Sequence, residues 1–127
     1  MGNSERWETG YETIQKVYAG EVAIPPEGTV PFLDLMLKQV FAEVWTREEL
    51  SMRDRRLLVM GVIAGMGESM PWGVQVKAAL KNGELTPVQV RETLIQLAQY
   101  AGYPRAAGLI AATEQAIAEV EKQGAES

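Results

Sequence analysis

Two residue types that carry much of protein chemistry are missing from this 127-residue chain, which has no cysteine and no histidine. Without cysteine, disulfides, thiolate metal sites and thiol redox chemistry are excluded. Without histidine, the chain lacks the side chain that most often moves protons near neutral pH and binds transition metals. The carboxylates show neither Glu-x-x-His nor calcium-loop spacing. We therefore expect no metal site.

Charge and hydropathy limit which partners the protein can bind and where in the cell it is expected. The net charge of −5 and the pI near 4.8 argue against nonspecific nucleic-acid binding, which needs concentrated Lys and Arg. No apolar run approaches membrane-spanning length, and the opening MGNSERWETG lacks the apolar core of a signal peptide. We therefore expect a cytoplasmic protein that binds neither nucleic acid nor membrane.

Helical periodicity recurs along the chain, and no strand pattern interrupts it. The length and the 46% hydrophobic content are typical of one globular domain. We predict an all-α, single-domain bundle over residues 1–127, with residues 1–4 and 123–127 frayed. It should contain about six helices, over residues 4–18, 31–45, 53–67, 72–81, 87–101 and 105–122.

A helical hairpin over residues 74–104 should form the core of this bundle. Asn82-Gly83 can adopt the positive φ that ends one helix and reverses the chain. Thr86 and Gln89 have the spacing of a capping box around Pro at the first helical position. Gly102 is placed to end the second helix.

Two stretches indicate close contacts. The apolar face of residues 31–45 is wide enough to predict burial on more than one side, by the core and by a partner subunit. Gly61, Gly65 and Gly67 lower helix propensity within residues 53–67. Such a cost is reasonable where another backbone packs closely, and we expect one there.

Three stretches together resemble a known family. In chain order, ERWETGYETIQKVYAG, VWTREELSMRDRRLL and ALKNGELTPVQVRETLIQLAQYAGYPRA are similar to the gamma-carboxymuconolactone decarboxylase family. The resemblance covers roughly residues 6–119. It implies an alkylhydroperoxidase-D-like helical protomer in a homo-oligomer, a trimer or a hexamer. It also implies a cofactor-independent lyase that decarboxylates a small carboxylated lactone in aromatic compound catabolism.

The chain departs from this family at two glutamines. Gln75 and Gln96 stand where the resemblance places histidines. Glutamine can hold a carboxylate or carbonyl but cannot exchange protons near neutral pH, so the histidine-based proton transfer is expected to be lost. Related alkyl hydroperoxidases use a Glu, two Cys and a His, and those positions fall on Arg56, Glu68, Pro71 and Gln75. Thiol peroxidase chemistry is thereby excluded.

An arginine cluster is the first candidate for substrate binding. Arg53, Arg55 and Arg56 lie at an expected helix start, where a guanidinium fork and the helix dipole both favour a substrate carboxylate. The alternative is that they pair with neighbouring acids, namely Glu48, Glu49 and Asp54. The predicted substrate-binding set is Arg53, Arg55, Arg56, Trp72, Gln75 and Gln96.

Three residues are candidates for catalysis. Glu68, at a helix break beside Trp72, is a candidate general acid or base, or else a solvated loop carboxylate. Glu43 is a second candidate for proton transfer. Tyr100 lies four residues after Gln96, so the two can line one pocket or else satisfy each other within the bundle.

Three functions stay open. The first is a decarboxylase-like lyase that acts on a small organic acid or lactone with altered proton transfer. The second is a catalytically inactive family member that serves as a small-molecule binder or oligomeric scaffold. The third is a helical interaction module without a pocket. A closed, partly apolar cavity lined by Gln75, Gln96 and an arginine would exclude the third.

Overall fold

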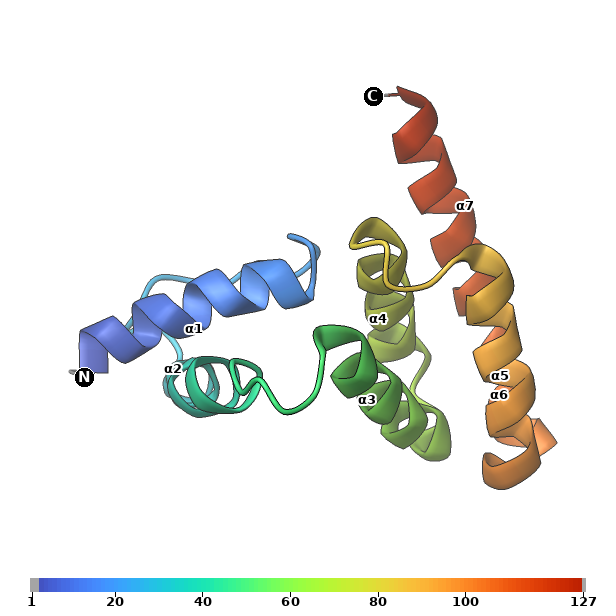
Figure 1. The fold of residues 1–127 in the computed structure, drawn as a ribbon, viewed down its shortest axis with the longest axis horizontal. Coiled ribbons are helices and arrows are strands. Elements are labelled where there is room, and N and C mark those ends of the chain that lie inside the picture. The colour runs from blue at the N-terminus through green and yellow to red at the C-terminus, as the bar shows by residue number, and fades with distance from the viewer. Residues whose placement is uncertain (1–2, 127) are drawn as a thin grey trace. The chain divides into compact units, whose positions relative to one another are not determined.

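The structure, a computed structural model, describes residues 3–126 and is all-α (Figure 1). No strand occurs between these residues, so the predicted fold class is confirmed, as is the prediction of about six helices. Residues 1, 2 and 127, part of the termini predicted to fray, lie outside the described residues; α7 itself continues to Glu126. The helices are α1 (Asn3–Val17), α2 (Pro31–Met36), η1 (Leu37–Val44), α3 (Met52–Met66), α4 (Ser69–Lys81), α5 (Pro87–Ala101), α6 (Tyr103–Ala107) and α7 (Ile110–Glu126).

Packing divides the chain into two compact units, one up to Met52 and one from Arg53 onward. The single domain predicted over residues 1–127 stays a prediction, and each unit is described by itself. Over the described part of the chain, no helix has both the length and the apolar character needed to cross a bilayer.

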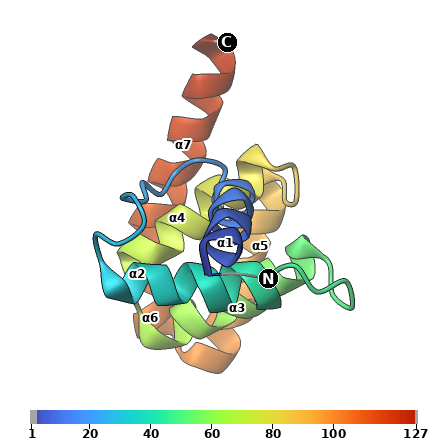
Figure 2. The same cartoon turned by 90° about the vertical axis from the view of Figure 1, so that its left-hand side faces the viewer.

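Unit 1 is built from α1, which crosses η1 and packs on it, with α2 running directly into η1 (Figures 1 and 2). The predicted helix over residues 31–45 is one continuous run whose second part is a π-helix, in which Trp45 N–H donates to the Val40 carbonyl at 2.9 Å. Within unit 1 its wide apolar face is buried at Leu37 and Phe41, whereas Phe32 is 75% exposed. Burial of this face by a partner subunit stays a prediction. The buried apolar residues of this unit are Trp7, Ile14, Val17, Leu37 and Phe41.

Gly10 marks the closest approach of backbones in unit 1. A Cβ at this position of α1 would overlap the backbone carbonyl of Leu37 in η1. The glycines of residues 53–67 do not have the backbone contact predicted for them. A Cβ at Gly61 would meet only the Leu97 side chain, at 3.7 Å, and one at Gly65 would meet nothing within 4 Å.

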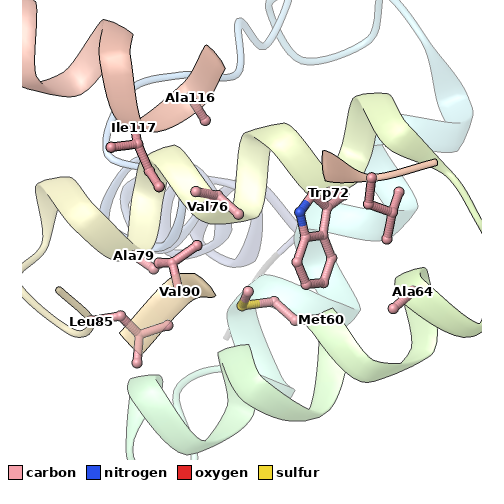
Figure 3. Close-up of a cluster of buried hydrophobic side chains, with 10 residues drawn as sticks. Met60, Ala64, Trp72, Val76, Ala79, Leu85, Val90, Ala116 and Ile117 are labelled. Carbon is pink, nitrogen blue, oxygen red and sulfur yellow. The ribbon is translucent and has the colours of Figure 1, made fainter. Parts of the chain in front are cut away.

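Unit 2 packs α3, α4, α5 and α7 around one apolar core, and the end of α7 extends past the other helices of the unit (Figures 1 and 2). Trp72 and Val76 of α4 lie at its centre, with Met60 of α3 below the Trp72 ring (Figure 3). The fully buried or nearly buried core residues are Met60, Ala64, Trp72, Val76, Ala79, Leu85, Val90, Leu109, Ala116 and Ile117.

The predicted hairpin is formed by α4 and α5. Gly83 has a φ of 69° in the turn. Thr86 accepts from the Gln89 N–H at 3.2 Å, and the Gln89 side chain accepts from the Thr86 N–H at 2.9 Å, which confirms the capping box. Gly102, with a φ of 100°, ends α5 as predicted.

Two helix boundaries differ from the prediction. The helix expected to begin at Trp72 begins at Ser69 instead, so Pro71 lies in its first turn. The helix tolerates proline there because backbone N–H groups of the first turn have no partner within the helix. The helix expected over residues 105–122 is two helices, α6 and α7, separated at Gly108.

Candidate functional site

A buried polar network joins the start of α3 to α4 and to the turn before α5. The Arg56 side chain is fully buried and donates to both carboxylate oxygens of Glu84, from Nε at 2.8 Å and Nη2 at 3.0 Å. Its Nη1 donates to Gln75 Oε1 at 2.9 Å. Burying a guanidinium is costly unless it is paired and hydrogen-bonded, and this geometry meets both conditions.

The same network fixes the turn that closes the hairpin. Asn82 Nδ2 donates to Glu84 Oε2 at 3.3 Å. Arg53, one turn before Arg56 on α3, donates from Nε to the Glu84 backbone carbonyl at 3.0 Å. Because Leu85 follows Glu84 directly, the network also sets where Leu85 and Arg53 lie.

Arg53 and Leu85 belong to a cavity of about 390 Å³ within unit 2. Its size falls within the range of small-molecule sites. Helix α3 forms one wall of the cavity and α5 forms the other. The lining consists of apolar side chains and a few polar ones. The lining residues are Arg53, Leu57, Met60, Leu85, Gln89, Glu92, Thr93, Gln96 and Leu97.

The polar side chains of this cavity differ in whether their hydrogen-bonding atoms already have partners within the protein. Gln89 Oε1 is engaged in the capping box, and Thr93 Oγ1 donates to the Val90 carbonyl at 2.6 Å. The Gln96 side chain makes no hydrogen bond to any described residue and offers both a donor and an acceptor. Arg53 uses Nε within the protein, and its nearest carboxylate oxygen, on Asp54, lies 3.9 Å from Nη1. The cavity thus presents a cation and an uncommitted amide.

The structure does not bring the two glutamines together as predicted. Gln96 lines the cavity, whereas Gln75 is 3% exposed, bonds to Arg56 and is not among the lining residues. The arginines also differ, since Arg53 lines the cavity and Arg56 is held by Glu84. Arg55 is half-buried on α3 and does not line the cavity. Only Arg53 and Gln96 of the predicted binding set share it.

Three other predicted residues of unit 2 lie away from the cavity. Trp72 is fully buried in the core, and its Nε1 donates to Thr113 Oγ1 at 2.7 Å. Tyr100 is 86% exposed and does not line the cavity with Gln96. Glu68 is exposed at the N-terminal cap of α4 and makes no side-chain capping bond. Glu43 belongs to unit 1, where it pairs with Arg6.

Two acidic residues of the site were missed. Glu84 directly follows Asn82-Gly83, and a carboxylate next to a turn is normally expected to be solvated. The sequence therefore gave no signal of a buried ion pair there. Glu92 does carry a sequence signal, because Gln89, Glu92 or Thr93, and Gln96 recur at the spacing of one helix face. A polar stripe of this kind on a core hairpin indicates a lined cavity as well as a solvated surface.

Two further hollows in unit 2 carry ion pairs. The first, about 260 Å³ between α5, α6 and α7, has Arg91 bonded to both carboxylate oxygens of Glu114, at 3.0 and 2.8 Å. Hydrogen bonding to Glu114 raises the pKa of Arg91, and the bond from Arg91 lowers the pKa of the Glu114 carboxyl. The second, about 290 Å³ between α4 and α7, contains Lys77 and Glu119, and the bond from Lys77 lowers the pKa of Glu119.

Within residues 3–126, no three acidic side chains converge as ligands of a metal ion would.

Comparison with known proteins identifies similar sequences. The family model described as carboxymuconolactone decarboxylase matches residues 31–123. Nitrosuccinic acid decarboxylase npaB of Metarhizium robertsii is 28% identical over 96 residues, which are 76% of this chain and 66% of that protein. The chain therefore matches just under two thirds of the length of this curated relative.

Proposed function

Because the chain belongs to the carboxymuconolactone decarboxylase family, we propose that it is a decarboxylase-like lyase whose cavity beside Arg53 binds a small carboxylated organic molecule. The observation that carries the proposal is the pairing, within one cavity, of a partly committed arginine and an uncommitted amide. The name of the fungal relative, a nitrosuccinic acid decarboxylase, supports the reaction type.

Each polar group has a distinct part in the proposed reaction. The Arg53 guanidinium holds a substrate carboxylate through charge-assisted hydrogen bonds. Loss of CO₂ breaks a carbon–carbon bond and leaves the electron pair on the substrate, where a carbonyl, lactone or nitro group accepts it. The Gln96 NH₂ donates to that group as negative charge develops on it.

The carbon that loses CO₂ must then take a proton. Water that enters beside the exposed side chains of Arg53, Glu92 and Gln96 supplies it in this proposal. Glu43, Glu68 and Tyr100 remain proposed as proton-transfer residues. Glu68 and Tyr100 do not line the cavity, so each would act only through an intervening water or a movement of its side chain.

A specific observation supports a second candidate, a family member that binds its ligand without turnover. Gln75 stands at one of the two positions where the family resemblance places histidine, and its carbonyl is bonded to a buried arginine. An amide held in this way cannot transfer a proton near neutral pH.

Turnover separates the two candidates. The purified protein would be incubated with 4-carboxymuconolactone, nitrosuccinate and nitroacetate, and CO₂ release would be measured above the uncatalysed background. We expect release from at least one compound; nitroacetate carries one carboxylate and the other two compounds carry two. Saturable binding of these compounds without release would support the binder, and neither binding nor release would contradict both candidates.

Substitution of Arg53 tests whether this residue binds the substrate carboxylate. Arg53→Ala is expected to raise KM by roughly 10- to 100-fold, since a hydrogen bond to a charged group contributes about 1.5–3 kcal/mol. Arg53→Lys should retain part of the affinity because it keeps the charge. Arg47→Ala, at an exposed arginine of unit 1, is the control and should leave KM unchanged. Equal KM values for Arg53→Ala and the wild type would remove Arg53 from the site.

We also propose that the protein is a homo-oligomer, and an apolar stripe on α3 supports this. Leu58, Val62 and Met66 follow one another at four-residue spacing and are each more than 60% exposed (63%, 64% and 62%). Val62→Glu would place a charge in the middle of the stripe and should reduce the assembly to monomers in light scattering coupled to size-exclusion chromatography. A wild-type protein that is already a monomer would contradict this proposal.

A further inference from the structure

The cavity contains one acid in addition to its arginine. We propose that Glu92 makes this cavity prefer molecules with a single carboxylate and a neutral or cationic hydrogen-bond donor at the other end over dicarboxylates of the same size. This inference rests on the proposed function of the cavity as a carboxylate site.

Glu92 is placed to act on a ligand and has no structural task of its own. Its side chain is exposed on α5, lines the cavity and forms no ion pair or hydrogen bond with any described residue. In particular, Arg53 on the opposite wall is bonded to the Glu84 carbonyl and not to Glu92. The two side chains therefore face one cavity as separate charges, and the formal charge of its lining is zero.

The arrangement of the two walls sets where a ligand's second end lies. A carboxylate bound to Arg53 leaves the rest of the molecule to extend between the apolar side chains Leu57 and Leu97 towards α5. On α5, Glu92 and Gln96 are four residues apart and share one face, about 6 Å apart along the axis. The far end of the ligand thus meets an amide and a carboxylate.

A second carboxylate at that end would be repelled by Glu92. Like charges a few ångströms apart weaken binding by about tenfold. An amide, hydroxyl or ammonium group would instead donate to the Glu92 carboxylate, which can accept several hydrogen bonds. A single acidic side chain therefore distinguishes ligands that are otherwise of the same size and shape.

Succinate and succinamate form a matched pair for the test, because they differ only in whether the second end is a carboxylate or an amide. Their dissociation constants would be measured by titration calorimetry at one ionic strength, for the wild type, Glu92→Gln and Glu126→Gln. Side-chain amide NMR signals of Gln96, assigned with Gln96→Leu, would locate the binding. Glu126→Gln removes the same charge from an exposed position at the end of α7 and serves as the control.

We expect the wild type and Glu126→Gln to prefer succinamate by about tenfold, and Glu92→Gln to lose most of this preference. An unchanged ratio in Glu92→Gln, or no preference in the wild type, would overturn the inference while leaving the carboxylate site intact. Failure of both probes to bind, with the Gln96 signals unmoved in the wild type and in Glu92→Gln, would overturn the inference and the proposed site together.

Discussion

Glu84→Ala is expected to lower the free energy of unfolding by about 3–5 kcal/mol, because it leaves the buried Arg56 guanidinium without its counter-charge. Both carboxylate oxygens of Glu84 accept from Arg56, whose side chain is completely shielded from solvent. Alanine supplies no acceptor in their place. Urea unfolding followed by far-UV circular dichroism measures the loss, which is a large share of the stability of a typical domain.

The chain contains a matched control for this prediction. Arg91 and Glu114 form the same two-bond pairing, at 3.0 and 2.8 Å, but each side chain is 49% exposed. Glu114→Ala should therefore lower the free energy of unfolding far less than Glu84→Ala does. Similar losses for Glu84→Ala and Glu114→Ala would show that burial does not set the value of the Arg56 pair.

A double substitution separates the charge from the packing. Arg56→Met combined with Glu84→Leu removes both charges and keeps apolar volume in the site. We expect the double variant to be more stable than Glu84→Ala, because no buried charge is left unpaired. The measurement is the same unfolding titration.

The local parts of the fold were predictable from the sequence, because their causes lie within a few residues of each other. The Thr86–Gln89 capping box and the Gly102 helix end depend only on neighbouring backbone groups, and both occur as predicted. The division of the last helix at Gly108 was missed. A glycine inside an apolar-periodic stretch signals either a break or a close contact, and the pattern does not distinguish them.

The long-range parts of the site were not predictable in the same way. Arg56 and Glu84 are 28 residues apart, and nothing local to Arg53, Arg55 or Arg56 indicates which one turns inward. The direction in which each arginine points depends on the rotation of α3 about its axis. Arg56 is fully buried, whereas Arg53, three residues earlier, is exposed and donates to the Glu84 carbonyl. The expected pairing of these arginines with Glu48 and Glu49 is not what holds Arg56.

The two glutamines show that a position shared with a family does not by itself determine what a side chain contacts. Both were predicted to bind substrate, but Gln75 on α4 is enclosed with Arg56, and Gln96 on α5 faces the cavity. A polar residue on a helix of the core can equally satisfy a buried charge or meet a ligand. The choice depends on which neighbour lies opposite, and that neighbour comes from α3.

Gly10→Ala is expected to lower the free energy of unfolding by about 3 kcal/mol, since the added methyl group has no room. Its Cβ would overlap the backbone carbonyl of Leu37, and a backbone atom cannot turn aside as a flexible side chain can. Relief requires α1 and η1 to separate. That separation would open the contacts of the buried residues Ile14 and Phe41 in unit 1.

Gly65→Ala provides the opposite expectation for the same chemical change. This glycine also lies inside a helix, α3, but a Cβ there meets nothing within 4 Å. The substitution should stabilise the protein by about 0.5–1 kcal/mol, because alanine favours the helix over glycine. Opposite signs for the two variants in one urea titration would locate the close backbone contact at α1 and η1. A stabilising Gly10→Ala would mean that α1 and η1 do not approach each other in solution as they do at Leu37.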